Sequence, residues 1–382
     1  MAIASSGAVS FSDLRTEYVG GSSAISYSDL YRGGSNVRAK ASDNNATNLA
    51  ASVPTSGVIN LANFHGTAKG FKNTISSSTT NVDAAALFGD DYDVNYPKII
   101  DINSGVTLGG VSDDALGIPS GLAGTLVINN AGNIYGFGGT GNGGSGGTAI
   151  HCASSNVTIN NTGEIRGGGG AGNIGGQGGQ GGNGSYTSTT RSPSSGESYH
   201  QYFTYWLSGS ETTFHLYWWV TYSGGYYTTG GYNYTGTTYV YNGWTHHKGT
   251  QQWSSNEWNM KKYALYRTQT STTTTTGGAG GAGGNGGVGQ GYNQSAGTGL
   301  TGSNGAAGGT NAGSGGQGGN GGNGGSWATA GGDGTGGLTG GNGNASNGSG
   351  GAGGGTGGAA GVAVAGTSVT MNNTGTISGT VA

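Results

Sequence analysis

The residues best suited to chemistry in this chain are aromatic, and most of them lie in one segment, residues 186–276. That segment holds 14 of the 21 tyrosines and 6 of the 7 tryptophans, with Thr, Ser, Gly and Asn between them. Aromatic rings provide large, rigid contact areas and small polar residues provide adaptable hydrogen bonds, as in antibody binding sites. The same rings can stack on sugar faces while Asn, Gln and His bind hydroxyl groups. The segment therefore predicts a surface that binds a glycan or a protein.

Twelve residues of this segment are candidate contact residues. They are Tyr202, Tyr205, Trp206, Trp218, Trp219, Tyr226, Tyr227, Tyr232, Tyr234, Trp244, His246 and Trp253. For any single ring, the alternative is a place in the hydrophobic core of the segment. So many rings with polar tips cannot all be buried, and exposed aromatic patches usually bind something. Packing of the rings between subunits of a purely structural fibre is the alternative for the whole set.

The same segment offers little for metal binding or catalysis. Its histidines have no cysteine or carboxylate at the spacing of metal ligands. A glycosidase needs two carboxylates that flank one bond, and Glu197, Glu211 and Glu257 stand in no such motif. We therefore expect a protein that is not an enzyme, with no catalytic residues, no metal and no cofactor. A polysaccharide depolymerase is the weaker alternative.

Composition limits the rest of the molecule. Glycine supplies 91 of 382 residues, only 8% of residues are charged, and the net charge of −3 gives no electrostatic case for nucleic acid. A single cysteine, Cys152, excludes an intrachain disulfide framework. The start of the chain lacks the basic and apolar regions of a secretory signal, so we expect synthesis in the cytoplasm without a signal peptide.

Three glycine arrays repeat with a period of three, Gly-Gly-X. They span residues 167–184, 277–287 and 315–325, and X is often Asn, Gln or Ala. Period three is that of the polyproline-II-type helix, in which bare glycine edges let neighbouring helices hydrogen-bond backbone to backbone. Disorder is the alternative, because glycine loses much backbone entropy on ordering. The strict period favours a packed bundle of polyglycine-II helices with Asn and Gln on outward edges or bridging between helices.

A second repeat has the form apolar–x–apolar–Asn–Asn–x–Gly–x–Ile–x–Gly. Its copies are Leu126–Gly136, Val157–Gly167 and, with Met in place of one aliphatic residue, Val369–Gly379. Each copy predicts a strand, a turn and a second strand, and such a unit cannot bury its apolar face alone. The three copies should therefore stack, and everything between the second and third should leave the stack and return to it.

A third repeat occupies the first 70 residues. Its copies are Ser6–Leu14, Ser23–Leu30 and Ser56–Phe64. In each, a short apolar stretch runs into Ser or Asn at a plausible helix N-cap, and a glycine follows a turn or two later. We expect a small N-terminal region, either a plain solvated domain or a docking module.

These patterns together resemble a known class of proteins. The opening Ser6–Leu14 resembles the start of many phage fibre or tail-tip proteins, and Ile102–Leu108 and Leu126–Gly139 resemble their β-region. The glycine arrays look like those of T-even-type distal tail-fibre adhesins, which form a sandwich of polyglycine-II helices. In that family variable distal loops contact outer-membrane proteins or lipopolysaccharide. This chain departs from the family in carrying one large aromatic insert instead of several short variable segments.

The resemblance completes the expected fold and function. We expect a mainly β protein with a polyglycine-II bundle, an aromatic β-hairpin insert and little α-helix. Alternating aromatic and polar residues, with turn signals at 222–226 and 241–244, predict the hairpins of the insert. Residues 1–70 would dock to other tail-fibre or baseplate proteins, 71–166 closed by 367–382 would form a stacked β-rich base, and 167–185 with 277–366 would form the glycine-rich region. The insert 186–276 would bind a host surface glycan or outer-membrane protein, and the protein would reside in the phage tail. A monomer and a homotrimer both fit the sequence.

Overall fold

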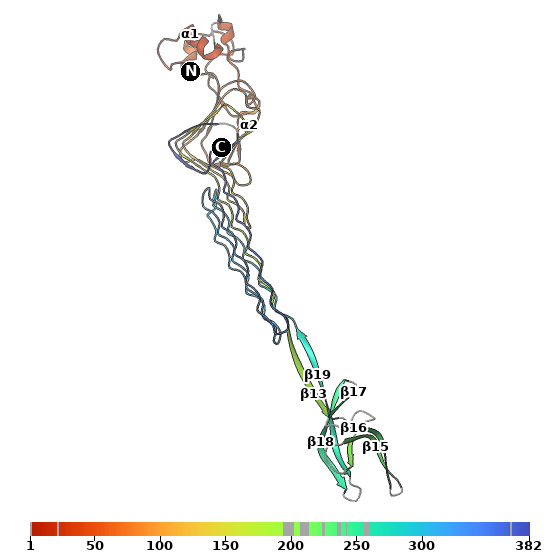
Figure 1. The fold of residues 1–382 in the computed structure, drawn as a ribbon. Coiled ribbons are helices and arrows are strands. Elements are labelled where there is room, and N and C mark those ends of the chain that lie inside the picture. The colour runs from red at the N-terminus through yellow and green to blue at the C-terminus, as the bar shows by residue number, and fades with distance from the viewer. Residues whose placement is uncertain are drawn as a thin grey trace.

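The computed structural model describes residues 2–20, 23–193, 202–206, 214–223, 226–234, 238–241, 243–255, 260–366 and 369–382. The molecule is elongated, with four parts in succession along its length (Figure 1). An N-terminal module lies at one end and a β-rich base follows it. Glycine-rich segments run from the base to a sheet at the far end, and the C-terminus lies in the base.

In the N-terminal module, residues 1–70, each repeat copy contains the start of a short helix. These helices are α1 (Phe11–Leu14), which continues as a π-helix (Arg15–Val19), and two 3-10 helices (Tyr27–Leu30 and Leu61–Phe64). Capping boxes form between Ser10 and Asp13, Ser26 and Asp29, and Asn60 and Asn63. The predicted N-caps are therefore confirmed, and each satisfies backbone N–H groups that a short helix leaves unpaired.

The repeat also explains the core of this module. Leu14, Leu30 and Phe64 occupy the same position of the three copies, and all three are fully buried in one hydrophobic cluster. One copy alone could not enclose such a side chain. The three copies therefore fold as one unit.

A buried carboxylate fixes the module to the base. Asp91 is fully buried and accepts hydrogen bonds from Arg38 Nε at 3.1 Å, from the Ala41 backbone N–H at 2.8 Å and from Asn44 Nδ2 at 3.2 Å. A two-residue strand, β1 (Thr47–Asn48), also pairs antiparallel with the first strand of the base. The module and the base are thus joined by backbone and side-chain bonds.

In the described residues, the base is a parallel β-solenoid of five rungs with three faces. Its first face contains β2 (Phe71–Ile75), β5 (Lys98–Ile102), β8 (Leu126–Asn130), β11 (Val157–Asn161) and β21 (Val369–Asn373). The second contains β3 (Thr79–Thr80), β6 (Thr107–Gly109), β9 (Asn133–Tyr135), β12 (Glu164–Arg166) and β22 (Thr376–Ser378). The third contains β4 (Val82–Asp83), β7 (Leu116–Ile118), β10 (Ile150–Cys152) and β20 (Val364–Gly366). Helix α2 (Ala84–Phe88) and a 3-10 helix (Gly89–Asp91) connect the first two rungs.

The three Asn-Asn copies stack in register, as predicted. Strand β11 pairs with β8 on one side and with β21 on the other, so that Ile159 lies between Ile128 and Met371. Side-chain amides form ladders along the stack, and Asn161, almost fully buried, donates to Asn373 Oδ1 at 2.7 Å and accepts from Asn130 Nδ2 at 2.7 Å. The paired asparagines thus satisfy one another, as buried polar groups must.

One lysine is enclosed in this base. Lys98 is fully buried, and its ammonium donates to the carbonyl oxygens of Val94 at 2.7 Å, Tyr96 at 3.1 Å and Ala123 at 2.8 Å. Burial lowers the pKa of Lys98 from 10.5 to about 8, and the charges of nearby aspartates oppose that shift. The three donors of the ammonium are therefore matched by three acceptors.

The long excursion leaves the solenoid after β12 and returns at β20. Both strands belong to the fourth rung, so the excursion interrupts that rung between its second and third faces. It spans residues 167–363, and a shorter excursion, residues 136–149, leaves the rung below at the same corner. Strand Val364–Gly366, which the sequence pattern assigns to the glycine-rich region, pairs with β10 and belongs to the base. The solenoid therefore acts as a platform from which the rest of the chain extends.

Within the described residues, the excursion contains six extended segments, here called rods 1 to 6. They comprise residues 167–183, 277–291, 296–308, 312–325, 329–343 and 346–361. Rod 1 donates to rod 2 from Gly175, Gly178 and Gly181, and it bonds to rods 4, 5 and 6 at the same interval. The predicted three-residue period is confirmed by these bonds. The polyproline-II-type backbone of each rod stays a prediction.

Glycine is required in the rods because the backbones approach one another closely. A Cβ atom at Gly175 would lie 2.0 Å from the carbonyl oxygen of Gly319, and one at Gly176 would lie 1.9 Å from that of Ala352. Along rod 1 the X residues Gln177 and Gln180 are exposed while the glycines between them are buried. Rod 1 thus uses two bare edges for packing and one edge for side chains.

A tryptophan at the turn between rods 4 and 5 ties the bundle to the base. The ring of Trp327 lies 4.8 Å from that of Tyr135, centroid to centroid, and the Arg166 guanidinium lies 5.9 Å from the centroid of the Trp327 ring. The backbone N–H of Trp327 donates to Gln290 Oε1 at 3.1 Å. Through Trp327, the turn between rods 4 and 5 and residue Gln290 of rod 2 are therefore attached to the second face of the solenoid.

Candidate functional site

The far end of the bundle carries a two-stranded ribbon that continues two of the rods. Strand β13 (Gly184–Pro193) follows rod 1, β19 (Met260–Thr275) precedes rod 2, and the two pair antiparallel over the whole of β13. The turns between neighbouring rods hold the root of this ribbon. Asn311 Nδ2 and Asn344 Nδ2 donate to the Ser185 carbonyl oxygen at 3.1 and 2.8 Å. These turns end at the ribbon's root, and the ribbon alone extends beyond them (Figure 1).

The ribbon opens into an antiparallel sheet. Its strands are β14 (Tyr202–Trp206), β15 (Phe214–Ser223), β16 (Tyr226–Tyr234), β17 (Thr238–Tyr241) and β18 (Trp244–Ser255), in the order β16-β15-β14-β19-β18-β17. Ser223 lies opposite Tyr226, and Tyr241 lies opposite Trp244. Both predicted hairpins are therefore confirmed by their strand pairing.

All twelve candidate contact residues lie on strands of this sheet. Tyr202, Tyr205 and Trp206 are in β14, Trp218 and Trp219 in β15, Tyr226, Tyr227, Tyr232 and Tyr234 in β16, and Trp244, His246 and Trp253 in β18. The side chain of Trp244 is described, and the other eleven side chains lie outside the described part of the structure. Their role in binding stays a prediction.

Trp244 packs against an arginine of the ribbon. The guanidinium of Arg267 lies 4.3 Å from the centroid of the Trp244 ring, and both side chains are half-buried. Arg267 Nε also donates to Ser192 Oγ at 3.2 Å. A cation over a tryptophan face is an attractive arrangement, so this pair stiffens the point where β17, β18 and β19 meet.

A second stack involves residues that are not among the twelve candidate contact residues. His247 stacks on Tyr266 with ring centroids 4.9 Å apart and an interplanar angle of 11°, and the Arg191 guanidinium lies 4.0 Å from the Tyr266 centroid. His247 Nε2 forms a hydrogen bond with Thr268 Oγ1 at 2.7 Å. The three residues come from three neighbouring strands, and their contact depends on strand register. No local sequence pattern could have revealed it.

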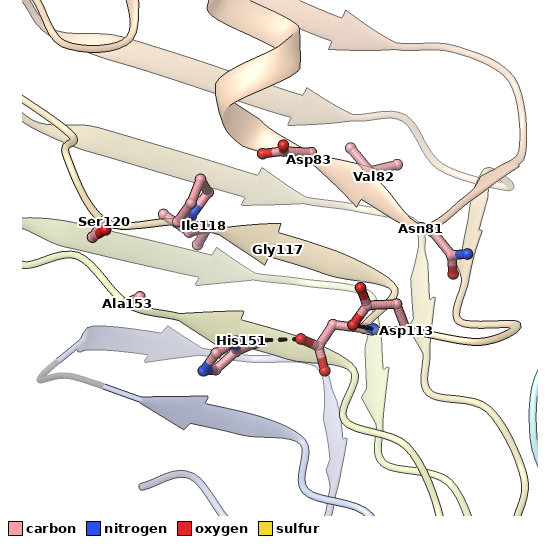
Figure 2. A pocket seen from close by; sticks show the side chains of 11 residues that line it. Asn81, Val82, Asp83, Asp113, Gly117, Ile118, Ser120, His151 and Ala153 are labelled. Atoms are coloured by element: carbon pink, nitrogen blue, oxygen red, sulfur yellow. Dashed lines mark hydrogen bonds and ion pairs between the residues drawn. The ribbon is translucent and has the colours of Figure 1, made fainter.

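The described residues also contain a shallow pocket on the third face of the base, about 420 Å³ in volume (Figure 2). Gly117 forms its floor, between Asp83 of β4 and His151 of β10, which lie in register with it. His151 Nδ1 lies 3.3 Å from Asp114 Oδ2, and burial raises the pKa of Asp114. No group of three or more metal-ligating side chains is assembled anywhere in the described ranges. Glu197, Glu211 and Glu257 lie outside those ranges.

Sequence comparison identifies the family. The family described as phage tail fibre adhesin Gp38 matches residues 70–261, half of the chain, including strands β2 to β12 of the base, rod 1 and most of the insert. The chain belongs to this family. Membership makes it an adhesin of the bacteriophage tail fibre, within a family of adhesins rather than enzymes. The predicted mainly β fold with little α-helix is confirmed, since α1 and α2 span four and five residues.

Further comparisons add one solved structure. The crystal structure of the gp37-gp38 adhesin tip complex of the bacteriophage S16 long tail fiber is similar at 18% sequence identity and a TM-score of 0.32. The similarity covers 86% of this chain and 88% of the other. A search of curated protein sequences finds no match. Within the described residues of this Gp38-family chain, no helix has the length and hydropathy needed to cross a membrane.

Proposed function

We propose that the insert, residues 186–276, binds a receptor on the host cell surface and thereby starts adsorption of the phage. The receptor is a glycan or an outer-membrane protein. The observation that carries the proposal is the position of the sheet, which ends the molecule opposite the N-terminal module (Figure 1). The aromatic and hydroxyl-rich composition of the insert supports a binding role, and its attachment through the ribbon leaves the sheet clear of the rods.

The N-terminal module, residues 1–70, docks the adhesin to other tail-fibre or baseplate proteins in this proposal. Its rigid attachment to the base through Asp91 supports the role, because a docking element must transmit position to the rest of the molecule. The rods of one chain bond to one another, which supports a monomeric bundle, although a homotrimer is compatible with the same bonds.

Removal of the insert tests the receptor-binding role. A variant in which a short Gly-Asn-Gly turn joins Ser185 to Thr274 keeps the root of the ribbon and all six rods. Labelled full-length protein should bind host cells and block phage adsorption, and the deletion variant should do neither. Hydrogen exchange of the rod amides provides the control, since it should be the same in both proteins.

The result also separates the alternatives. Undiminished cell binding by the deletion variant would refute the proposal. A fibre protein whose aromatics pack between subunits would instead show a changed oligomeric mass on deletion, measured by light scattering. A depolymerase would release new reducing ends from host polysaccharide.

A further inference from the structure

Charge is distributed unevenly along the chain. The insert, residues 186–276, contains five Lys and Arg residues and three Asp and Glu residues, whereas the rest of the chain contains eight and thirteen. The binding end is therefore positive and the body is negative. A ligand that is attracted to the tip and repelled by the body is an anion.

Arg191 is the described cation of the insert whose geometry fits an anion best. It is exposed on the ribbon, and its guanidinium carbon lies over the Tyr266 ring, 4.0 Å from the centroid. Within the described residues, its guanidinium makes no hydrogen bond or ion pair with the protein. Stacking on a ring holds a guanidinium in place while leaving its N–H groups in the plane available, and that fork matches a carboxylate or phosphate.

The surroundings of Arg191 favour a sugar. Because side chains alternate between the two faces of a strand, Arg191 shares its face of the ribbon with Thr189 and, on β19, with Thr268 and Thr270. Thr189 Oγ1 and Thr270 Oγ1 lie 3.2 Å apart, and both residues are exposed. A row of hydroxyl groups beside a cation suits sugar hydroxyls beside an acidic group.

The shape of this face also favours a polymer of sugars over a protein. A specific protein–protein interface buries about 1,200–2,000 Å² in total, which needs a broad surface. At Arg191 the strands β18 and β17 widen the sheet, but from Thr189 and Thr270 to the rods the ribbon is two strands wide, so its face narrows there to a track. An extended glycan can follow such a track.

We propose that Arg191, Tyr266 and the neighbouring threonines form a subsite for the carboxylate or phosphate group of a host surface glycan. His247 stacks on the Tyr266 ring and is itself held by its hydrogen bond to Thr268, so it positions that ring. The inference rests on the proposed receptor-binding role and assigns its ligand class.

The test compares charged probes with matched neutral ones on the full-length protein. Immobilised oligogalacturonate and its methyl ester differ in the carboxylate, and phosphomannan and mannan differ in the phosphate. The protein should bind the charged member of a pair at about 20 mM salt and lose affinity at about 200 mM, because exposed charges are screened. The pair that shows the difference identifies the anionic group.

Substitutions then locate the site. Arg191→Gln should weaken binding of the charged probe roughly tenfold or more, the range of a lost charge-assisted hydrogen bond. Arg191→Lys keeps the charge but loses the fork, so its affinity should fall between those of the wild type and Arg191→Gln. The control is Arg15→Gln, which removes one positive charge from the N-terminal module and should leave binding unchanged.

Three outcomes would overturn the inference: equal binding of charged and neutral probes, unchanged affinity of Arg191→Gln, or an equal loss in Arg15→Gln. Each can occur while deletion of the insert still abolishes cell binding. In that case the receptor-binding role stands and the ligand class is wrong. The selectivity for charged probes tests the ligand class, and the loss of cell binding on deletion of the insert tests the receptor-binding role, so the two can fail independently.

Discussion

Replacement of a single rod glycine by alanine gives the sharpest test of the glycine bundle. Gly179 of rod 1 faces rod 6, and a Cβ atom there would lie 1.9 Å from the carbonyl oxygen of Ser349. The next residue of rod 6, Gly350, faces open space, with nothing within 4 Å of a Cβ atom. Gly179→Ala should therefore disrupt the bundle, and Gly350→Ala should not.

The expected magnitude follows from the contact. A carbon and a carbonyl oxygen in contact lie about 3.3 Å apart, so rods 1 and 6 would have to separate by more than an ångström. The bond from the Ser349 N–H to the Gln180 oxygen is 2.8 Å long, and that from Ala352 to Gln177 is 2.7 Å. Such a separation breaks both, at roughly 0.5–1.5 kcal/mol for each hydrogen bond lost at these exposed residues. The loss of stability should be about 2 kcal/mol.

The control should move in the opposite direction. The φ angle of Gly350 lies outside the left-handed region, so alanine fits there without backbone strain. Alanine at such a site restricts the unfolded chain and stabilises the fold by roughly 0.4–1 kcal/mol. Thermal unfolding and hydrogen exchange of the rod amides measure both variants. Equal stability of Gly179→Ala and Gly350→Ala would refute the close-packed arrangement.

Three further variants test the contacts that hold the parts together. Trp327→Ala should remove the ring contact with Tyr135 and cost about 2 kcal/mol, and faster exchange should appear at the end of the rods near the base, not near the ribbon. Asp91→Ala should leave Arg38 and two further donors without their acceptor, at about 3 kcal/mol, and limited proteolysis should then release the N-terminal module. Because the pKa of Lys98 is about 8 in the fold against 10.5 unfolded, the unfolded state holds more protons between these values, and stability should rise with pH from 8 to 9.5. The slope of denaturant midpoints against pH should be smaller in Lys98→Met, and an identical slope would contradict the assignment.

Much of the scaffold follows from repeats in the sequence. The Asn-Asn copies predicted their own stacking, because one copy cannot bury its apolar strand and all three carry the same residues at the same spacing. The period of three in the arrays predicted the interval of the hydrogen bonds, since bare glycine edges recur at that interval. The N-caps of the first 70 residues were predictable because a capping box is local.

Other parts of the scaffold depend on contacts between distant segments. The third face of the solenoid consists of strands of two or three residues, such as Val82–Asp83, which carry no period. Trp327 stands alone in a glycine-rich stretch, and nothing near it in sequence indicates that it meets Tyr135. In the candidate site, the strands and hairpins were predictable, but the Arg191–Tyr266–His247 stack was not, because it is set by register across three strands.

The route by which the ribbon enters the bundle has a mechanical consequence. Strands β13 and β19 run directly into rods 1 and 2, which bond to each other from Gly169 to Gly181 and to four further rods at every third residue. A pull along the axis loads these transverse bonds together, in shear, and not one after another as in a zipper. Resistance to detachment should then increase with rod length. A cell held by such a tip in flowing liquid would be released by loss of the surface contact before the adhesin itself comes apart.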